Sequence, residues 1–166
     1  MPGGRVITCN SLSKTFSITG WRIGFAIAPE NVADFLTVGA AAPLQEAVCA
    51  SFKLGEPYYK GLQDLYTKKK EIFLGGLDRA GLKHNDPKGA YFVLVDISPF
   101  LEKPMFKGWS DLEFCSWMIK EVGVAAVPGS SFFKDGTNNY IRLHFARSEE
   151  SLKEATDRLL KLNKYL

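Results

Sequence analysis

The pattern of apolar and polar positions predicts both strands and helices in the first third of the chain. Apolar, β-branched runs at Arg5–Asn10 and Trp21–Ala28 are typical of two short strands. One or two helices are expected over Asn31–Gly55, with Pro43 in a first helical turn, where proline is tolerated. Because two strands form only a marginal sheet by themselves, we expect this part to be the tail of a larger domain.

A longer helix is predicted from Pro57 onward. The run Lys68–Lys70 lies mostly off its apolar face, so we interpret the run as a solvated helix surface, with a binding patch as the alternative. The apolar residues of the helix share one face: Leu62, Leu65, Tyr66, Ile72, Phe73 and Leu77.

The rest of the chain alternates between strand, loop and helix patterns. Ser110 and Glu113 form a capping box that opens a helix, and Ser148 begins a last helix. The buried stripe of that last helix is expected to contain Leu152, Ala155, Leu159 and Leu162. Strands are predicted at Ala90–Ile97, Val124–Val127 and Tyr140–Phe145. These patterns indicate an α+β domain over residues 66–166, preceded by a remnant of another domain over residues 1–65.

Length and charge set limits on the kind of protein. The 166 residues can form one sizeable core, or one domain and part of another. The net charge of +3 is spread along the chain, which gives no argument for a nucleic-acid or membrane partner. Because there is neither a secretory signal nor an apolar run of roughly 20 residues, we expect a cytoplasmic protein, or an organellar one if a transit peptide lay upstream.

The cysteines and histidines give no sign of a metal site. Cys9, Cys49 and Cys115 are widely spaced and odd in number, which favours reduced core thiols over a disulfide framework. His84 and His144 lack the clustered acidic or sulfur ligands that a metal site needs. We predict no metal.

The most informative segment is Ser11–Gly24, where a lysine is followed eight residues later by an arginine between glycines. The amine of Lys14 could condense with an aldehyde cofactor such as pyridoxal phosphate. Arg22 and the hydroxyls of Ser11 and Ser13 suit the phosphate of that cofactor, and the glycines allow the backbone to come close. The alternative is an ordinary exposed lysine beside a surface arginine.

This segment resembles the lysine signature of class I and II aminotransferases, which are fold type I pyridoxal-phosphate enzymes. The resemblance implies that Lys14 forms the Schiff base with pyridoxal 5′-phosphate and that Ser11 and Arg22 bind its phosphate. In the family this motif lies past the middle of the chain. The implied fold is therefore α/β, with the last strands of the large-domain sheet and an α+β small domain. The family's aspartate, tyrosine, asparagine and glycine-rich turn that also hold the cofactor are missing from this sequence, which puts catalysis by this chain alone in doubt.

Arg142 is the candidate for binding substrate. It lies in an apolar strand, where a guanidinium should meet a carboxylate, and its two-point geometry suits the α-carboxylate of an amino acid. The resemblance implies this role, and a structural ion pair is the alternative. Arg147, at a strand end beside a helix cap, is a weaker candidate.

Two further segments resemble parts of the family's substrate cleft. Tyr91 matches an aromatic residue that approaches the substrate side chain, with core packing as the alternative. Pro128–Phe132 resembles a loop that lines the cleft, and the alternative is a turn needed only for folding.

The resemblance implies transamination between an amino acid and a 2-oxo acid by a homodimeric parent enzyme. The sequence Thr19–Arg22 is most similar to that of the branch with kynurenine, methionine and aspartate or prephenate aminotransferases. Two alternatives stay open. One is a non-catalytic fragment that serves in folding or oligomerisation, and the other is a pyridoxal-phosphate lyase of the same fold.

Overall fold

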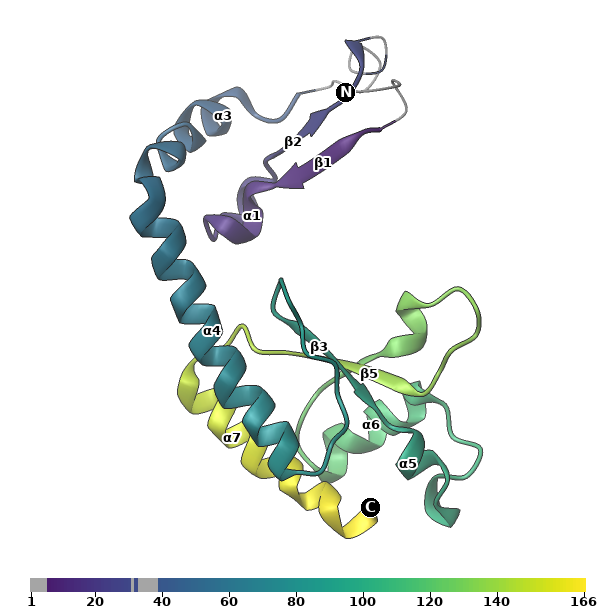
Figure 1. The fold of residues 1–166 in the computed structure, drawn as a ribbon. Coiled ribbons are helices and arrows are strands. Elements are labelled where there is room, and N and C mark those ends of the chain that lie inside the picture. Colours follow the sequence, from purple (N-terminus) through teal and green to yellow (C-terminus); the bar gives the residue numbers. More distant parts are fainter. Residues whose placement is uncertain (1–5, 31, 33–38) are drawn as a thin grey trace. The chain divides into compact units, whose positions relative to one another are not determined.

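The structure, a computed structural model, describes residues 6–30, 32 and 39–166 (Figure 1). The chain forms two compact units, Met1–Tyr59 and Lys60–Leu166, and each is described by itself. The domain boundary expected at residue 65 stays a prediction. No described helix is both long and apolar enough to cross a membrane.

The first unit contains a two-stranded antiparallel sheet that carries the lysine segment. β1 (Thr8–Ser11) pairs with β2 (Gly24–Ile27), and between them lie α1 (Leu12–Thr15) and the 3₁₀ turn η1 (Thr19–Trp21). Both predicted strands are confirmed but shorter. Arg5 lies outside the described residues. The second strand begins only at Gly24 because Trp21 belongs to the 3₁₀ turn and the next residue has a left-handed backbone.

The helical prediction after β2 is confirmed where the structure describes the chain. α3 (Ala42–Val48) has Pro43 in its first turn, and the 3₁₀ turn η2 (Ser51–Leu54) follows. Residues 31 and 33–38 of the predicted helices lie outside the described residues. A small core holds this unit together and consists of Leu12, Ile23 and Val48, flanked by Phe16, Ile18 and Leu44.

The long helix α4 (Gly55–Arg79) begins two residues before Pro57, which therefore lies in its first turn. Within the second unit, Phe73 and Leu77 of its predicted apolar face are buried, whereas Leu65 is 43% exposed. Leu65 is therefore not part of the core that the face was expected to form. Lys68 forms an ion pair with Glu149 (2.7 Å) and has a mostly exposed side chain.

The second unit is built on a three-stranded antiparallel sheet with the order β3–β5–β4. β3 (Phe92–Asp96) and β5 (Tyr140–His144) lie where the sequence predicted strands. The prediction of a strand at Val124–Val127 is wrong except for its last residue, because β4 contains only Val127–Pro128. Proline has no N–H group to continue the pairing, and the chain turns directly into η4 (Gly129–Phe132).

Helices cover this sheet and complete its core. α6 (Asp111–Glu121) begins at the predicted capping box, and α7 (Glu149–Leu159) is capped by Ser148. α7 lies along the carboxy-terminal part of α4 (Figure 1). The buried stripe predicted for the last helix is confirmed at Leu152, Leu159 and Leu162, although the last of these lies in η5 (Leu160–Tyr165). Shorter elements are α5 (Ser98–Leu101) and η3 (Pro104–Phe106).

The cysteines are free thiols, as expected, but they are not all in cores. Cys115 is buried, and burial, with a smaller contribution from Asp111, raises the pKa of its thiol to about 11. Cys9 and Cys49 are exposed, so the expectation of a core position is wrong for these two. Cys9 is exposed because β1 has no buried position along its length.

Candidate cofactor and substrate sites

Lys14 lies in a single helical turn that continues directly from β1. The hydroxyl of Ser11 caps this turn by accepting a hydrogen bond from the backbone N–H of Ser13 (3.3 Å). Because a hydroxyl that accepts can still donate, Ser11 keeps a donor for another group. Ser13 is 5% exposed, whereas Lys14 is exposed. The turn therefore fixes the backbone while leaving the lysine side chain accessible.

Hydrogen bonds connect Arg22 to the same turn. Ser11 is paired with Gly24 across the sheet, and the backbone N–H of Leu12 donates to the carbonyl of Ile23 (3.2 Å). Thr19 connects Ser13 to Arg22 by two hydrogen bonds. Its hydroxyl donates to the carbonyl of Ser13 (3.3 Å), and its own carbonyl accepts from Nη1 of Arg22 (3.1 Å).

The backbone in this segment is strained at two positions. Ser17 and Arg22 both have φ of 56°, in the left-handed region that is uncommon for residues other than glycine. Such conformations cost of order 1–3 kcal/mol and persist where the surroundings fix them, often at functional sites. This feature could not be predicted from the residue types, because neither residue is glycine, asparagine or aspartate.

The glycines that flank Arg22 have different surroundings. A Cβ atom at Gly24 would lie 2.5 Å from the carbonyl oxygen of Asn10, so the close approach at this position is between β1 and β2. Gly20 has open space around it. The close approach at Gly24 is therefore to the neighbouring strand, and the expected approach of these glycines to a phosphate stays a prediction.

The donor groups gathered here fit a phosphate-bearing aldehyde. They comprise one amine, one guanidinium and two hydroxyls within a single segment of the first unit. The side-chain amine of Lys14 forms no hydrogen bond or ion pair with residues 6–30, 32 or 39–166, so it is available for reaction. An amine nucleophile beside a cationic phosphate donor is the arrangement that such a cofactor requires.

Arg142 lies in the middle strand of the second unit, between Leu94 of β3 and Val127 of β4. Its guanidinium lies over two aromatic rings, with its Cζ atom 4.2 Å from the ring centroid of Phe92 and 4.1 Å from that of Phe132. Within the described part of the chain, Arg142 pairs with no carboxylate. The alternative of a structural ion pair is therefore not found in this part of the chain, and substrate binding stays a prediction. The two ring contacts were not predicted because the three residues are far apart in the chain.

Tyr91 is half-buried in an aromatic cluster. Its ring stacks on Tyr66 (centroids 5.9 Å apart) and is tilted against Phe92 (4.5 Å). Its carbonyl accepts a hydrogen bond from the backbone N–H of Phe145 (3.0 Å). Tyr91 therefore has the packing contacts of the alternative interpretation, and its contact with substrate stays a prediction.

The loop at Pro128–Phe132 is held by a carboxylate that the sequence did not single out. Asp111 is 2% exposed and accepts hydrogen bonds from the backbone N–H (2.7 Å) and the hydroxyl (3.0 Å) of Ser130. The sequence pointed only to the capping box of this helix, since the contact joins residues that are 19 positions apart.

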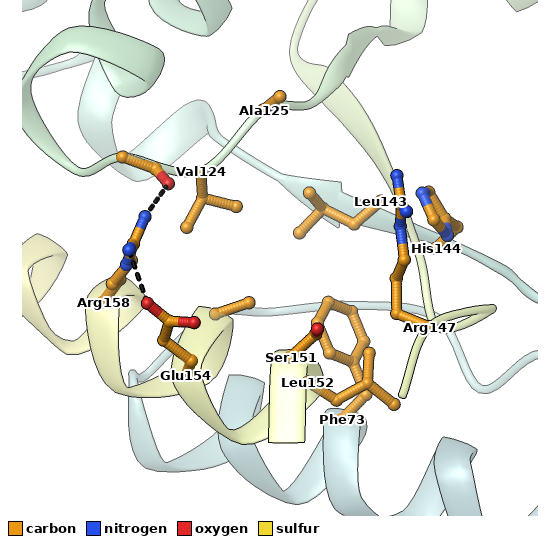
Figure 2. Close-up of a pocket in the computed structure, with 12 residues that line it drawn as sticks. Phe73, Val124, Ala125, Leu143, His144, Arg147, Ser151, Leu152, Glu154 and Arg158 are labelled. Atoms are coloured by element: carbon orange, nitrogen blue, oxygen red, sulfur yellow. Dashed lines mark hydrogen bonds and ion pairs between the residues drawn. The ribbon is translucent and has the colours of Figure 1, made fainter. Parts of the chain in front are cut away.

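Arg147 lines a different pocket of about 300 Å³, next to α7 (Figure 2). Figure 2 shows Arg147 beside His144, and Arg158 paired with Glu154 on the opposite side. Burial, together with the positive charges of Arg147 and Arg142, lowers the pKa of His144. None of the six predicted site residues lines this pocket.

The structure thus groups the predicted residues in two sets. Ser11, Ser13, Lys14 and Arg22 belong to the first unit, and Tyr91 and Arg142 belong to the second. In the described ranges, no group of three or more histidine, cysteine, aspartate or glutamate side chains could hold a metal ion.

Comparison with known proteins decides the family. The sequence model of the family described as "Aminotransferase class I and II" matches residues 1–159. The chain belongs to the class I and II aminotransferases. The resemblance found in Ser11–Gly24 is therefore confirmed over nearly the whole chain.

Curated relatives of this aminotransferase chain include the branch that the sequence predicted. It is 34% identical over 166 residues to methionine aminotransferase of Escherichia coli, covering 95% of this chain and 42% of the relative. It is 32% identical over 183 residues to kynurenine–oxoglutarate transaminase of Dictyostelium discoideum, covering 96% of this chain and 42% of the relative. The chain therefore spans about two fifths of the length of these relatives.

Solved structures agree with the predicted fold. The crystal structure of an Escherichia coli protein with methionine aminotransferase function matches with a TM-score of 0.81 and 33% identity, covering 96% of this chain and 43% of that one. The aromatic aminotransferase of Pyrococcus horikoshii OT3 matches with a TM-score of 0.81 and 30% identity, covering 99% of this chain and 44% of that one. The prediction of a carboxy-terminal portion of a fold type I enzyme is confirmed.

Proposed function

We propose that this chain is the carboxy-terminal part of a pyridoxal-phosphate-dependent enzyme that transfers an amino group between an amino acid and a 2-oxo acid. One observation carries the proposal. The unpaired amine of Lys14 lies on a turn that Thr19 joins to Arg22 by two hydrogen bonds. The names of the relatives, which include methionine, kynurenine and aspartate aminotransferases, support the same reaction.

The residues of the first unit would hold and assist the cofactor. When bound, pyridoxal phosphate supplies an aldehyde and an electron sink. The amine of Lys14 is the covalent attachment point, and once free it is the base that moves a proton from the α-carbon of the substrate. Arg22 binds the phosphate through charge-assisted hydrogen bonds, and Ser11 and Ser13 contribute hydroxyl donors.

The residues of the second unit would orient the amino acid. Arg142 holds the α-carboxylate with two parallel N–H donors, which restricts how the α-carbon can face the base. Tyr91 would contact the substrate side chain. We further propose that the complete enzyme is a homodimer and acts in the cytoplasm, or in an organelle if its chain carries a transit peptide.

Isotope transfer tests this proposal. The 166-residue chain and a longer protein that contains it are each supplied with pyridoxal phosphate, ¹⁵N-labelled L-methionine or L-kynurenine, and 2-oxoglutarate. We expect the longer protein to produce ¹⁵N-glutamate and Lys14→Ala to abolish this transfer. Lys53→Ala, which removes another exposed lysine of the first unit, is the matched control. Loss of transfer in the control alone, or its persistence in Lys14→Ala, would contradict the proposal.

One observation favours the second candidate, a non-catalytic fragment. Both strands of the first unit are exposed along their whole length, so this chain alone lacks a covered cofactor sheet. The absorbance of the purified chain separates the two candidates. A yellow chain retains cofactor on its lysine, whereas a colourless chain that stays colourless with added pyridoxal phosphate supports the fragment.

A further inference from the structure

The guanidinium of Arg142 contacts two aromatic rings. Phe92 is the first residue of β3 and lies diagonally across the sheet from Arg142, because Phe92 is paired with His144 and Leu94 with Arg142. Phe132 ends η4 and contacts the guanidinium from another part of the chain. The two ring centroids lie 4.2 and 4.1 Å from Cζ, within the range of a cation–π interaction.

The two ring contacts leave the N–H donors of the guanidinium without a hydrogen-bond partner among the described residues. All five N–H donors of arginine point outward in the plane of the group. A partner that approaches the edge of that plane can therefore accept from two of them. Within residues 6–30, 32 and 39–166, no carboxylate pairs with Arg142, so this edge is not used by an ion pair. Edge-on approach is the geometry of a bidentate carboxylate.

The backbone of the loop that ends in Phe132 is held in place, although the Phe132 side chain is 47% exposed. Ser130 donates two hydrogen bonds, at 2.7 and 3.0 Å, to the buried carboxylate of Asp111. Gly129 packs so closely on β5 that an added Cβ atom would lie 2.5 Å from the carbonyl oxygen of Tyr140. The loop therefore has little freedom to withdraw the Phe132 ring from the arginine.

We propose that Phe92 and Phe132 form a clamp that pre-organises Arg142 for a carboxylate, and that Asp111 fixes the clamp through Ser130. All three are positioning residues, since the group that touches the ligand is Arg142. The inference rests on the proposed function only for the class of ligand. Its energetic basis is that a side chain already held in its binding conformation loses less conformational freedom on binding.

The clamp is tested by ¹⁵N NMR of arginine side chains in the 166-residue chain. Stacking between two rings predicts an Nε–Hε signal of Arg142 that is shifted upfield by ring currents and that disappears in Arg142→Lys. Phe92→Leu and Phe132→Leu should each move this signal toward the position of exposed arginines, and Phe132→Tyr should restore it. Phe133→Leu is the matched control, because Phe133 is the next residue and its ring is tilted against that of Tyr140 instead.

Asp111 needs two variants because Asp111→Asn could unfold the loop. Ser130→Ala removes only the hydroxyl bond and keeps the backbone bond to Asp111. We expect both variants to move the Arg142 signal in the same direction as Phe132→Leu, with the milder change in Ser130→Ala. If both variants left the signal where Phe133→Leu leaves it, Asp111 would not act through Ser130.

Titration with sodium pyruvate, a small 2-oxo acid, then tests the ligand. We expect pyruvate to shift the Arg142 signal and its dissociation constant to rise about two- to fivefold when either ring is removed, the range of an exposed cation–π contact. If the Arg142 signal lay at the position of exposed arginines and did not move in either ring variant, the clamp would be wrong. A clamped Arg142 that does not respond to pyruvate would instead overturn the carboxylate as ligand, and with it the substrate step of the proposed function.

Discussion

Single residues decide what the two candidate arginines can bind. Arg22 is held by its own backbone, which has a left-handed φ of 56°, and by the carbonyl of Thr19. Arg142 is held by rings, at 4.1 and 4.2 Å from their centroids. The first arrangement leaves donors for a phosphate beside Lys14, and the second leaves an edge for a carboxylate. The two arginines should therefore respond differently to substitution.

Substituting each arginine should separate cofactor binding from substrate binding in a longer protein that contains this chain. Arg142→Lys is expected to weaken amino-acid substrates about tenfold or more and to spare the cofactor, because an ammonium cannot make two parallel hydrogen bonds. Arg22→Ala is expected to weaken pyridoxal phosphate by a similar factor. Equilibrium titrations of both ligands measure this. If both variants weakened only the cofactor, the two assigned roles would be wrong.

His144 should make the stability of the second unit depend on pH. Its pKa is lowered in the folded state by burial and by Arg147 and Arg142, so the unfolded state binds more protons below about pH 6.5. The free energy of unfolding should therefore fall as the pH drops through 6.5 and level off below the folded pKa. Urea titrations followed by the amide signals of β5 measure this, and His144→Gln should reduce the slope. Arg147→Gln should bring the folded-state pKa of His144 closer to 6.5 and so make the pH-dependent loss of stability smaller. If neither variant changed the slope of the unfolding free energy against pH, the interpretation would be wrong.

Individual elements show which features local sequence can reveal. The capping box at Ser110 was readable because both partners lie three residues apart, and the structure contains both of its hydrogen bonds. The strands β3 and β5 could also be predicted, because each is a run of neighbouring residues with a recognisable apolar pattern. The short β4 was not, because its length is set by Pro128 and by the close packing of Gly129 on another strand. The aromatic clamp and its aspartate were hidden because they join distant residues.

The packing of α4 on α7 allows a sharp test with adjacent glycines. A Cβ atom at Gly76 would lie 2.1 Å from the side chain of buried Thr156, whereas one at Gly75 would meet nothing within 4 Å. Gly76→Ala should destabilise the second unit by about 1–3 kcal/mol through overpacking. Gly75→Ala should stabilise it by about 0.5–1 kcal/mol, since alanine favours a helix interior. Denaturant midpoints decide this, and equal effects of the two substitutions would contradict the helix packing described here.

At the scale of the whole molecule, the two units differ in how much they bury. The core of the second unit contains many fully buried side chains, among them Phe100, Phe106 and Phe114. Among the described residues of the first unit, the core contains three buried apolar residues, and Phe25 and Ile27 of β2 are 43% and 50% exposed. Family membership explains this contrast, because the chain spans about two fifths of its relatives.

This contrast predicts unequal stability in the isolated chain. Amide hydrogens of β1 and β2 should exchange with solvent rapidly, and those of β5 slowly, because exchange from a small exposed sheet needs little unfolding. Open strand edges also invite pairing between chains, so association should increase with concentration. Hydrogen exchange at several protein concentrations measures both effects. A monomeric chain with slow exchange in β1 and β2 would contradict the prediction.

The central claim, that Lys14 is the attachment point of the cofactor, is tested most directly by reductive labelling. The 166-residue chain is incubated with increasing pyridoxal phosphate, reduced with borohydride, and mapped by mass spectrometry at every lysine. Lys14 should be labelled at lower cofactor concentration than the exposed Lys53, and Arg22→Ala should remove this preference because the phosphate then loses its guanidinium partner. Labelling of Lys14 no greater than that of Lys53, or a preference for another lysine, would contradict the account.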